Sequence, residues 1–197
     1  MVALQLDEPM SLPTPPASFR TLLRRFRRNR QASAALEFAL VAPMFFALLF
    51  AIIETALMFF ASQVLETITQ DSSRIIYTGQ AQNASLTQTQ FATCVCNRVQ
   101  ALFDCNSMWI DVESASSFPS AIATPVDASG NFVSPQFSPG GPGDVVLVRM
   151  GYKWPIFVTG LGYNIANLPG GKRLLTSSAA FKNEPYTSQP ATAGSCS

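Results

Sequence analysis

The chain has 197 residues, of which 48% are hydrophobic and 13% are charged, and it contains four cysteines and no histidine. Soluble domains carry about 25% charged residues on average, so the shortage of charge indicates a membrane segment. The absence of histidine excludes Ser-His-Asp and Cys-His catalytic sites, zinc fingers with histidine ligands and a histidine pH switch.

The charges are distributed unevenly along the chain. Residues 1–32 carry six arginines against two acidic residues, a net charge of +4, whereas residues 33–197 carry seven basic against ten acidic residues, a net charge of −3. The first part of residues 1–32 is rich in proline and small polar residues, and its apolar residues do not recur at a helical or strand spacing. We therefore interpret residues 1–32 as a basic, partly disordered leader.

The segment that follows the leader is strongly apolar. Residues 38–53 contain no charged or strongly polar side chain, with Glu37 directly before them and Glu54 directly after. Sixteen helical residues rise about 24 Å, slightly less than the ~30 Å hydrocarbon core, and flanking small and apolar residues extend the run. We predict a transmembrane helix over residues 33–61, with a mild kink at Pro43, which has no N–H to donate.

The arginines indicate the orientation of this helix. Basic residues concentrate on the cytoplasmic side of a span, so the N-terminus is expected in the cytoplasm and residues 62–197 outside it. A cleaved secretory signal is the alternative, although about 30 residues precede the apolar run. Topology explains the basic cluster without nucleic acid, since no helix-turn-helix or finger pattern accompanies it. The topology-determining residues are Arg24, Arg25, Arg27, Arg28 and Arg30.

The rest of the chain reads as an α+β domain. An amphipathic helical pattern continues past the span to a stop at Gly79, and Thr87-x-x-Gln90 resembles a capping box that opens a second helix, 87–103. Alternation predicts one strand from Met108 through MWIDVES, and two more follow, at 144–157 and 172–182. A loop rich in Ser, Pro and Gly, 114–143, separates the first two strands. We expect a small antiparallel sheet.

All four cysteines, Cys94, Cys96, Cys105 and Cys196, lie on the side placed outside the cytoplasm, where disulfides persist. Two structural disulfides are expected, with Cys96–Cys105 and Cys94–Cys196 favoured over Cys94–Cys105 and Cys96–Cys196. A zinc site is disfavoured, because the spacing is unsuitable and histidine is absent.

The acidic residues have several interpretations. Asp111 and Glu113 alternate with apolar residues on the first strand, which indicates a solvated face; together with Asp144 they form the basis of a weak alternative, a membrane enzyme. Glu37 and Glu54 differ, because carboxylates at the margins of a span are costly. Each either extends to its own interface or has a partner.

The stretch RRNRQASAALEFALVAPMFFALLFAIIETALMFF resembles the N-terminal segment of the TadE-like family, the pseudopilins of the tight-adherence (Flp, type IVc) pilus apparatus. The features in order are a basic run, small residues, Glu37-Phe-Ala-Leu, Pro43, a long apolar run and Glu54. The Phe-Asp-Cys followed by Trp-Ile-Asp-Val at residues 103–112 is also similar to the family. The resemblance implies a pilin-like fold and cleavage by a prepilin peptidase between Ala32 and Ser33, which would make Glu37 the fifth mature residue.

Ala32 departs from the glycine that prepilins prefer before the cut. The resemblance implies further that Glu37 supplies a counter-charge for the new α-amine, and that Glu37 and Glu54 act in helix assembly.

The expected function is a single-span component of the inner (cytoplasmic) membrane of a bacterium that acts as a pseudopilin or in pilus assembly. Its expected partners are the membrane, other pilin-like subunits and the prepilin peptidase. We expect no enzymatic activity, cofactor, metal, nucleic acid or small-molecule substrate. The rival hypothesis is a membrane-anchored periplasmic binding or scaffold module that never enters a pilus. It is motivated by Trp109, Trp154 and the phenylalanine-bearing loop.

Overall fold

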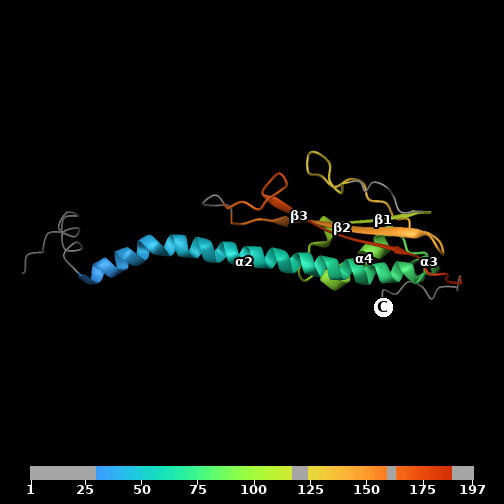
Figure 1. The fold of residues 1–197 in the computed structure, drawn as a ribbon, viewed down its shortest axis with the longest axis horizontal. Coiled ribbons are helices and arrows are strands. Elements are labelled where there is room, and N and C mark those ends of the chain that lie inside the picture. Colours follow the sequence, from blue (N-terminus) through green and yellow to red (C-terminus); the bar gives the residue numbers. More distant parts are fainter. Residues whose placement is uncertain (1–29, 117–123, 159–162, 188–197) are drawn as a thin grey trace, which may run out of the picture. The chain divides into compact units, whose positions relative to one another are not determined.

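The computed structural model describes residues 30–116, 124–158 and 163–187. Their arrangement confirms the expected α+β class: a long helix, two shorter helices and a three-stranded antiparallel sheet (Figure 1). The chain divides into two compact units, residues 1–46 and 47–197. The elements are α2 (Arg30–Tyr77), α3 (Gln80–Asn83), α4 (Gln88–Val99), the 3₁₀ turn η1 (Cys105–Ser107), β1 (Met108–Ala115), β2 (Val145–Pro155) and β3 (Lys172–Lys182).

Helix α2 runs for 48 residues and continues through Pro43. It ends where the sequence predicted, because Gly79 has φ +78°, a left-handed conformation that side chains rarely adopt. The ring of Tyr186 lies so close that a Cβ on Gly79 would be 2.4 Å from it. Glycine is therefore required here both for the backbone turn and for the close approach of the C-terminal segment.

The capping box predicted for the second helix is present. The Thr87 side chain accepts a hydrogen bond from the Gln90 backbone N–H, and the Gln90 side chain accepts one from the Thr87 backbone N–H. Two of the otherwise unpaired N–H groups at the start of α4 are satisfied in this way. The helix ends at Val99, earlier than the predicted residue 103, because a turn follows that leads into the disulfide at Cys105.

The sheet has the order β1-β2-β3, with β2 in the centre. Its pairing places Ile110 beside Met150 and Val148 beside Ala179, so alternate residues of all three strands face α2 and α4. Figure 1 shows the sheet along the C-terminal part of α2. The buried core combines Leu65, Ile68 and Ile76 of α2 with Phe91, Val95 and Val99 of α4 and Val112, Val146 and Met150 of the sheet.

The loop predicted at 114–143 is more ordered in part than the sequence indicated. Phe137 forms a parallel bridge with Val112. The Val112 N–H donates to the Gln136 carbonyl, and the Ser138 N–H donates to the Val112 carbonyl. This short segment extends the sheet along the edge of β1. It also covers the sheet face that carries Trp109, whose indole N–H donates to the Val133 carbonyl at 2.8 Å.

Candidate membrane-boundary site

The N-terminal part of α2 exposes apolar side chains in all directions. In the described residues, one helix is long and apolar enough to cross a membrane; the mean hydropathy of its most apolar 18-residue window is 2.4, and none of that window is buried. Apolar exposure on this scale is typical of a lipid-facing helix, because a soluble core helix of such composition would be covered. The large exposed side chains here include Phe38, Leu40, Val41, Met44, Phe45, Phe46, Leu48, Phe50, Ile52 and Ile53.

The surroundings of α2 change at Glu54. From this residue on, every third or fourth side chain is buried, at Glu54, Met58, Ala61, Leu65 and Ile68. The opposite face remains apolar and exposed for a further turn, through Leu57, Phe59 and Phe60. Burial at a spacing of three and four residues is the pattern of a helix packed on one side against a folded domain. Glu54 thus marks the point where the domain begins to cover the helix.

The Glu54 carboxylate is held by the connection between β2 and β3. It is 6% exposed, and its two oxygens accept hydrogen bonds from the backbone N–H groups of Phe157 and Val158, the latter at 2.9 Å. A carboxylate that accepts two backbone N–H groups is stabilised without a cation. Of the two alternatives predicted for Glu54, the structure therefore has the partnered one, and the partner belongs to the same chain. Contact of Glu54 with another subunit stays a prediction.

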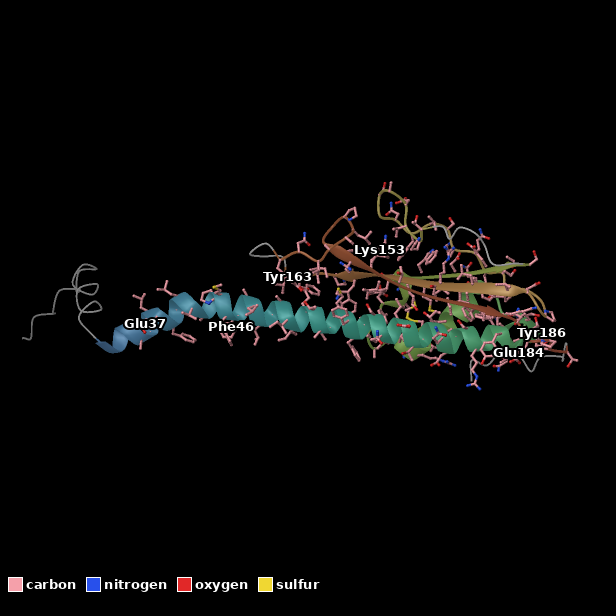
Figure 2. All side chains as sticks on the ribbon, viewed as in Figure 1. Glu37, Phe46, Lys153, Tyr163, Glu184 and Tyr186 are labelled. Atoms are coloured by element: carbon pink, nitrogen blue, oxygen red, sulfur yellow. A yellow bond between two sulfur atoms is a disulfide. The ribbon has the colours of Figure 1, made fainter. Side chains whose placement is uncertain are left out.

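A second contact attaches the same connection to α2. The Tyr163 hydroxyl hydrogen bonds with Thr55 Oγ1, which also donates to the Ala51 carbonyl at 2.7 Å. Figure 2 shows Tyr163 at one end of the domain and Glu184 and Tyr186 at the other. The segments that follow β2 and precede β3 are therefore joined to α2 at two successive residues, Glu54 and Thr55. The sequence indicates neither contact, because the bonded residues lie far apart in the chain.

Glu37 lies in the first compact unit, on the exposed surface of α2, and its neighbours Leu36 and Phe38 are exposed as well. Ala32 and Ser33 belong to the first turns of the same helix. The structure therefore places the predicted cleavage position in helical backbone close to Glu37. Arg30 is the first residue of α2, whereas Arg24, Arg25, Arg27 and Arg28 lie outside the described residues.

The favoured disulfide, Cys96–Cys105, is present and joins the end of α4 to η1, directly before β1. Cys94 is disulfide-bonded as well. Its predicted partner, Cys196, lies outside the described residues, so that pairing stays a prediction.

The prediction of a solvated face at Asp111 is wrong. Asp111 is 1% exposed, and its Oδ2 lies 2.7 Å from a guanidinium nitrogen of Arg149, while its Oδ1 accepts the Gln136 N–H. Glu113, which is partly exposed, lies 2.7 Å from the same guanidinium. The sheet register places Asp111 opposite Arg149, and the 131–138 segment covers both. This arrangement is a buried ion pair that holds the outer face of the sheet.

A cleft of about 600 Å³ lies beside this ion pair, and its lining includes Trp109, Phe132, Lys153 and Lys172. The Trp109 and Phe132 rings stack with centroids 5.7 Å apart, and the Lys153 ammonium lies 4.7 Å from the Phe132 centroid. The stack has room because Gly151 stands opposite Trp109; a Cβ there would lie 2.9 Å from Phe132. Trp109 therefore packs within the fold, and the charged side chains that line the cleft, Lys153 and Lys172, are both cationic.

At the opposite end of the domain, the Tyr186 phenol lies near the Asp144 carboxylate. Burial raises the pKa of the Tyr186 phenol above its ordinary value, and the nearby Asp144 carboxylate raises it further. The Asp144 carboxylate also accepts a hydrogen bond from the Gly141 N–H, which stabilises the turn between these two residues. In the ranges 30–116, 124–158 and 163–187, no three His, Cys, Asp or Glu side chains are grouped as a metal site.

Comparison with known proteins gives one finding. The family model described as TadE-like protein matches residues 32–74, which confirms the resemblance over that segment. The matched segment lies entirely within α2 and includes Glu37, Pro43 and Glu54. No curated protein and no solved structure matches the chain.

Proposed function

We propose that this chain, whose residues 32–74 match the TadE-like family, is a membrane-anchored pseudopilin-like component of the tight-adherence (Flp, type IVc) pilus system. The match supports involvement in that system. The observation that carries the finer proposal is the coincidence of the matched segment with a helix whose apolar side chains are exposed all round. Exposed apolar surface of this extent is stable in lipid or against other apolar helices, and a pseudopilin helix meets both.

The proposed location is the inner membrane of a bacterium, with the N-terminus in the cytoplasm and the α+β domain outside. The arginines of the leader support this orientation through the positive-inside rule. The Cys96–Cys105 bond supports it independently, because disulfides persist in oxidising compartments and are rare in the cytosol. A folded external domain on a single span is well suited to assembly contacts, so we propose an assembly role and no enzymatic one.

Glu37 is the proposed assembly carboxylate. It is exposed on α2 among exposed apolar residues, and carboxylates within membrane spans usually pair with positive groups. Cleavage between Ala32 and Ser33 would create such a partner, the α-amine of Ser33, on the same helix or on a neighbouring subunit. Glu54 differs from Glu37 in that each of its carboxylate oxygens accepts a backbone N–H of its own chain, and its part in helix assembly stays a prediction.

A charge substitution at Glu37 tests this proposal. Glu37→Gln keeps the shape of the side chain and removes the negative charge, so the partner amine is left uncompensated at a cost of several kcal/mol. We expect normal levels in the membrane but at least about a hundredfold fewer surface pili, because each 1.4 kcal/mol corresponds to a factor of ten. Glu37→Leu should behave in the same way, since it eases insertion and also removes the pair.

The matched control is Glu66→Gln, which removes a carboxylate from an exposed position in the domain half of the same helix. Surface pili are counted in a deletion strain that carries each variant, together with the membrane level of the protein. Normal piliation with both Glu37 variants would contradict the proposed assembly role, and loss of pili with Glu66→Gln would show that the assay does not distinguish the two carboxylates.

A second candidate function is a periplasmic binding module, which the cationic cleft favours. Lys172 is exposed at its rim, so Lys172→Gln should weaken capture of an anionic ligand without altering the fold. If piliation is normal in a strain that lacks the whole protein, this candidate replaces the first.

A further inference from the structure

Phe157 is the most exposed large apolar side chain among the described residues. It is 81% exposed, and in those ranges the other exposed large apolar side chain outside α2 is Val133, at 37%. Its neighbour Ile156 is buried, at 9%. The Ile156 side chain therefore points into the domain, and the Phe157 side chain, the second of the two, points away from it. Nothing within the described part of the domain covers the second.

The position of Phe157 along α2 is fixed by hydrogen bonds. The N–H groups of Phe157 and Val158 both donate to the Glu54 carboxylate, at the residue where α2 changes from exposed to half-buried. The Tyr163 contact with Thr55 holds the other arm of the connection at the same level. If the apolar part of α2 spans a membrane, its outer margin lies at this level, which is where aromatic side chains concentrate in membrane proteins.

Basic side chains accompany Phe157. The Ile156 N–H donates to the Gly171 carbonyl at 3.0 Å, which places Lys172 beside this end of β2. Lys172 is exposed, and Lys153 lines the cleft next to it. The acidic residues Asp144 and Glu184 belong to the other end of the strands. Cations at a membrane margin attract anionic headgroups over a distance of about one Debye length, ~8 Å.

We propose that Phe157 and Lys172 lie at the outer surface of the lipid bilayer, with Phe157 inserted among the headgroups and Lys172 beside the phosphates of anionic phospholipids. This inference rests on the proposed span by α2. It gives the external domain a second attachment to the membrane, besides the helix itself. The hydrogen bonds to Glu54 would then hold Phe157 at the depth of the lipid headgroups.

Site-directed spin labelling of the full chain in lipid vesicles tests the proposal. Nitroxide labels are attached to Phe157→Cys, to Phe46→Cys within the apolar part of α2, and to Thr176→Cys on the exposed face of β3. The Phe157 substitution keeps the backbone N–H that Glu54 binds. Collision rates with oxygen and with a water-soluble nickel chelate are measured in phosphatidylcholine vesicles, with and without phosphatidylglycerol.

The expected result is a Phe157 label that loses most of its access to the nickel chelate and gains access to oxygen, between the values at Phe46 and Thr176. Phosphatidylglycerol should deepen the Phe157 label, and Lys172→Gln should abolish that effect of the anionic lipid. A Phe157 label as accessible to nickel as the Thr176 label, with Phe46 still in lipid, would overturn the inference and leave the span intact.

Two further outcomes are distinguishable. A Phe46 label that is accessible to nickel would overturn the span itself, and the inference with it. Strong dipolar broadening between labels at Phe157, with no lipid contact, would identify a second copy of the chain as the occupant and overturn the lipid proposal.

Discussion

The two halves of α2 share one backbone conformation and differ in what surrounds their side chains. None of residues 34–53 is buried, although most are apolar, whereas Leu65, Ile68 and Ile76 in the second half are almost completely buried. The exposure of the two carboxylates follows the same division: Glu37 is exposed and Glu54 is buried. A single helix thus carries two interfaces, and its apolar residues stabilise the domain only beyond Glu54.

The largest effect on the domain half is expected from its buried ion pair. Asp111→Ala leaves the Arg149 guanidinium without its buried partner, and removing one member of such a pair costs about 3–5 kcal/mol of unfolding free energy. Glu113→Gln, at the partly exposed end of the same cluster, should cost much less. Urea unfolding of the full chain in detergent, followed by tryptophan fluorescence, measures both. Equal costs for the two variants would contradict the central role of Asp111.

A pair of leucines compares the two halves directly. Leu65→Ala creates a cavity in the core and should lower the unfolding free energy of the domain by about 2–4 kcal/mol. Leu48→Ala, at a position 62% exposed, should change it by less than about 0.5 kcal/mol. The same unfolding assay applies. A large loss of domain stability from the Leu48 variant would show that the apolar half of α2 also packs on the domain.

The smallest of these effects concerns the boundary itself. Glu54→Gln replaces one accepting oxygen by an NH₂ group, so one of the Phe157 and Val158 N–H groups loses its acceptor at a cost of about 1–2 kcal/mol. Amide hydrogen exchange at residues 156–158 should become about 10-fold faster, with little change in the core strands. Glu66→Gln is the control. Unchanged exchange at 156–158 would mean that the Glu54 bonds do not hold the connection.

Local signals predicted much of this architecture. Hydropathy and Gly79 indicated the extent of α2, and the Thr87–Gln90 pattern indicated the start of α4. Alternation predicted the first strand, and all three predicted strands lie within one or two residues of the observed ones. Each of these depends on residues close together in the chain. The spacing of the cysteines likewise favoured the Cys96–Cys105 bond, which closes a short loop.

The contacts that define the candidate site are distant in sequence, and no local pattern indicates them. Glu54 bonds residues more than a hundred positions away, and Asp111 became buried because the β1–β2 register set it opposite Arg149. Alternation alone predicts that Asp111 faces away from the core, which is correct. It does not reveal that the 131–138 segment returns to cover that face.

The central claim is that α2 crosses the membrane once and that the α+β domain lies outside the cytoplasm. Two reporters fused after Ser197 test it most directly, one active only outside the cytoplasm and one active only inside. The account predicts that the first is active and the second is silent, because basic residues such as those of the leader concentrate on the cytoplasmic side of a span. An active cytoplasmic reporter with a silent external one would contradict it.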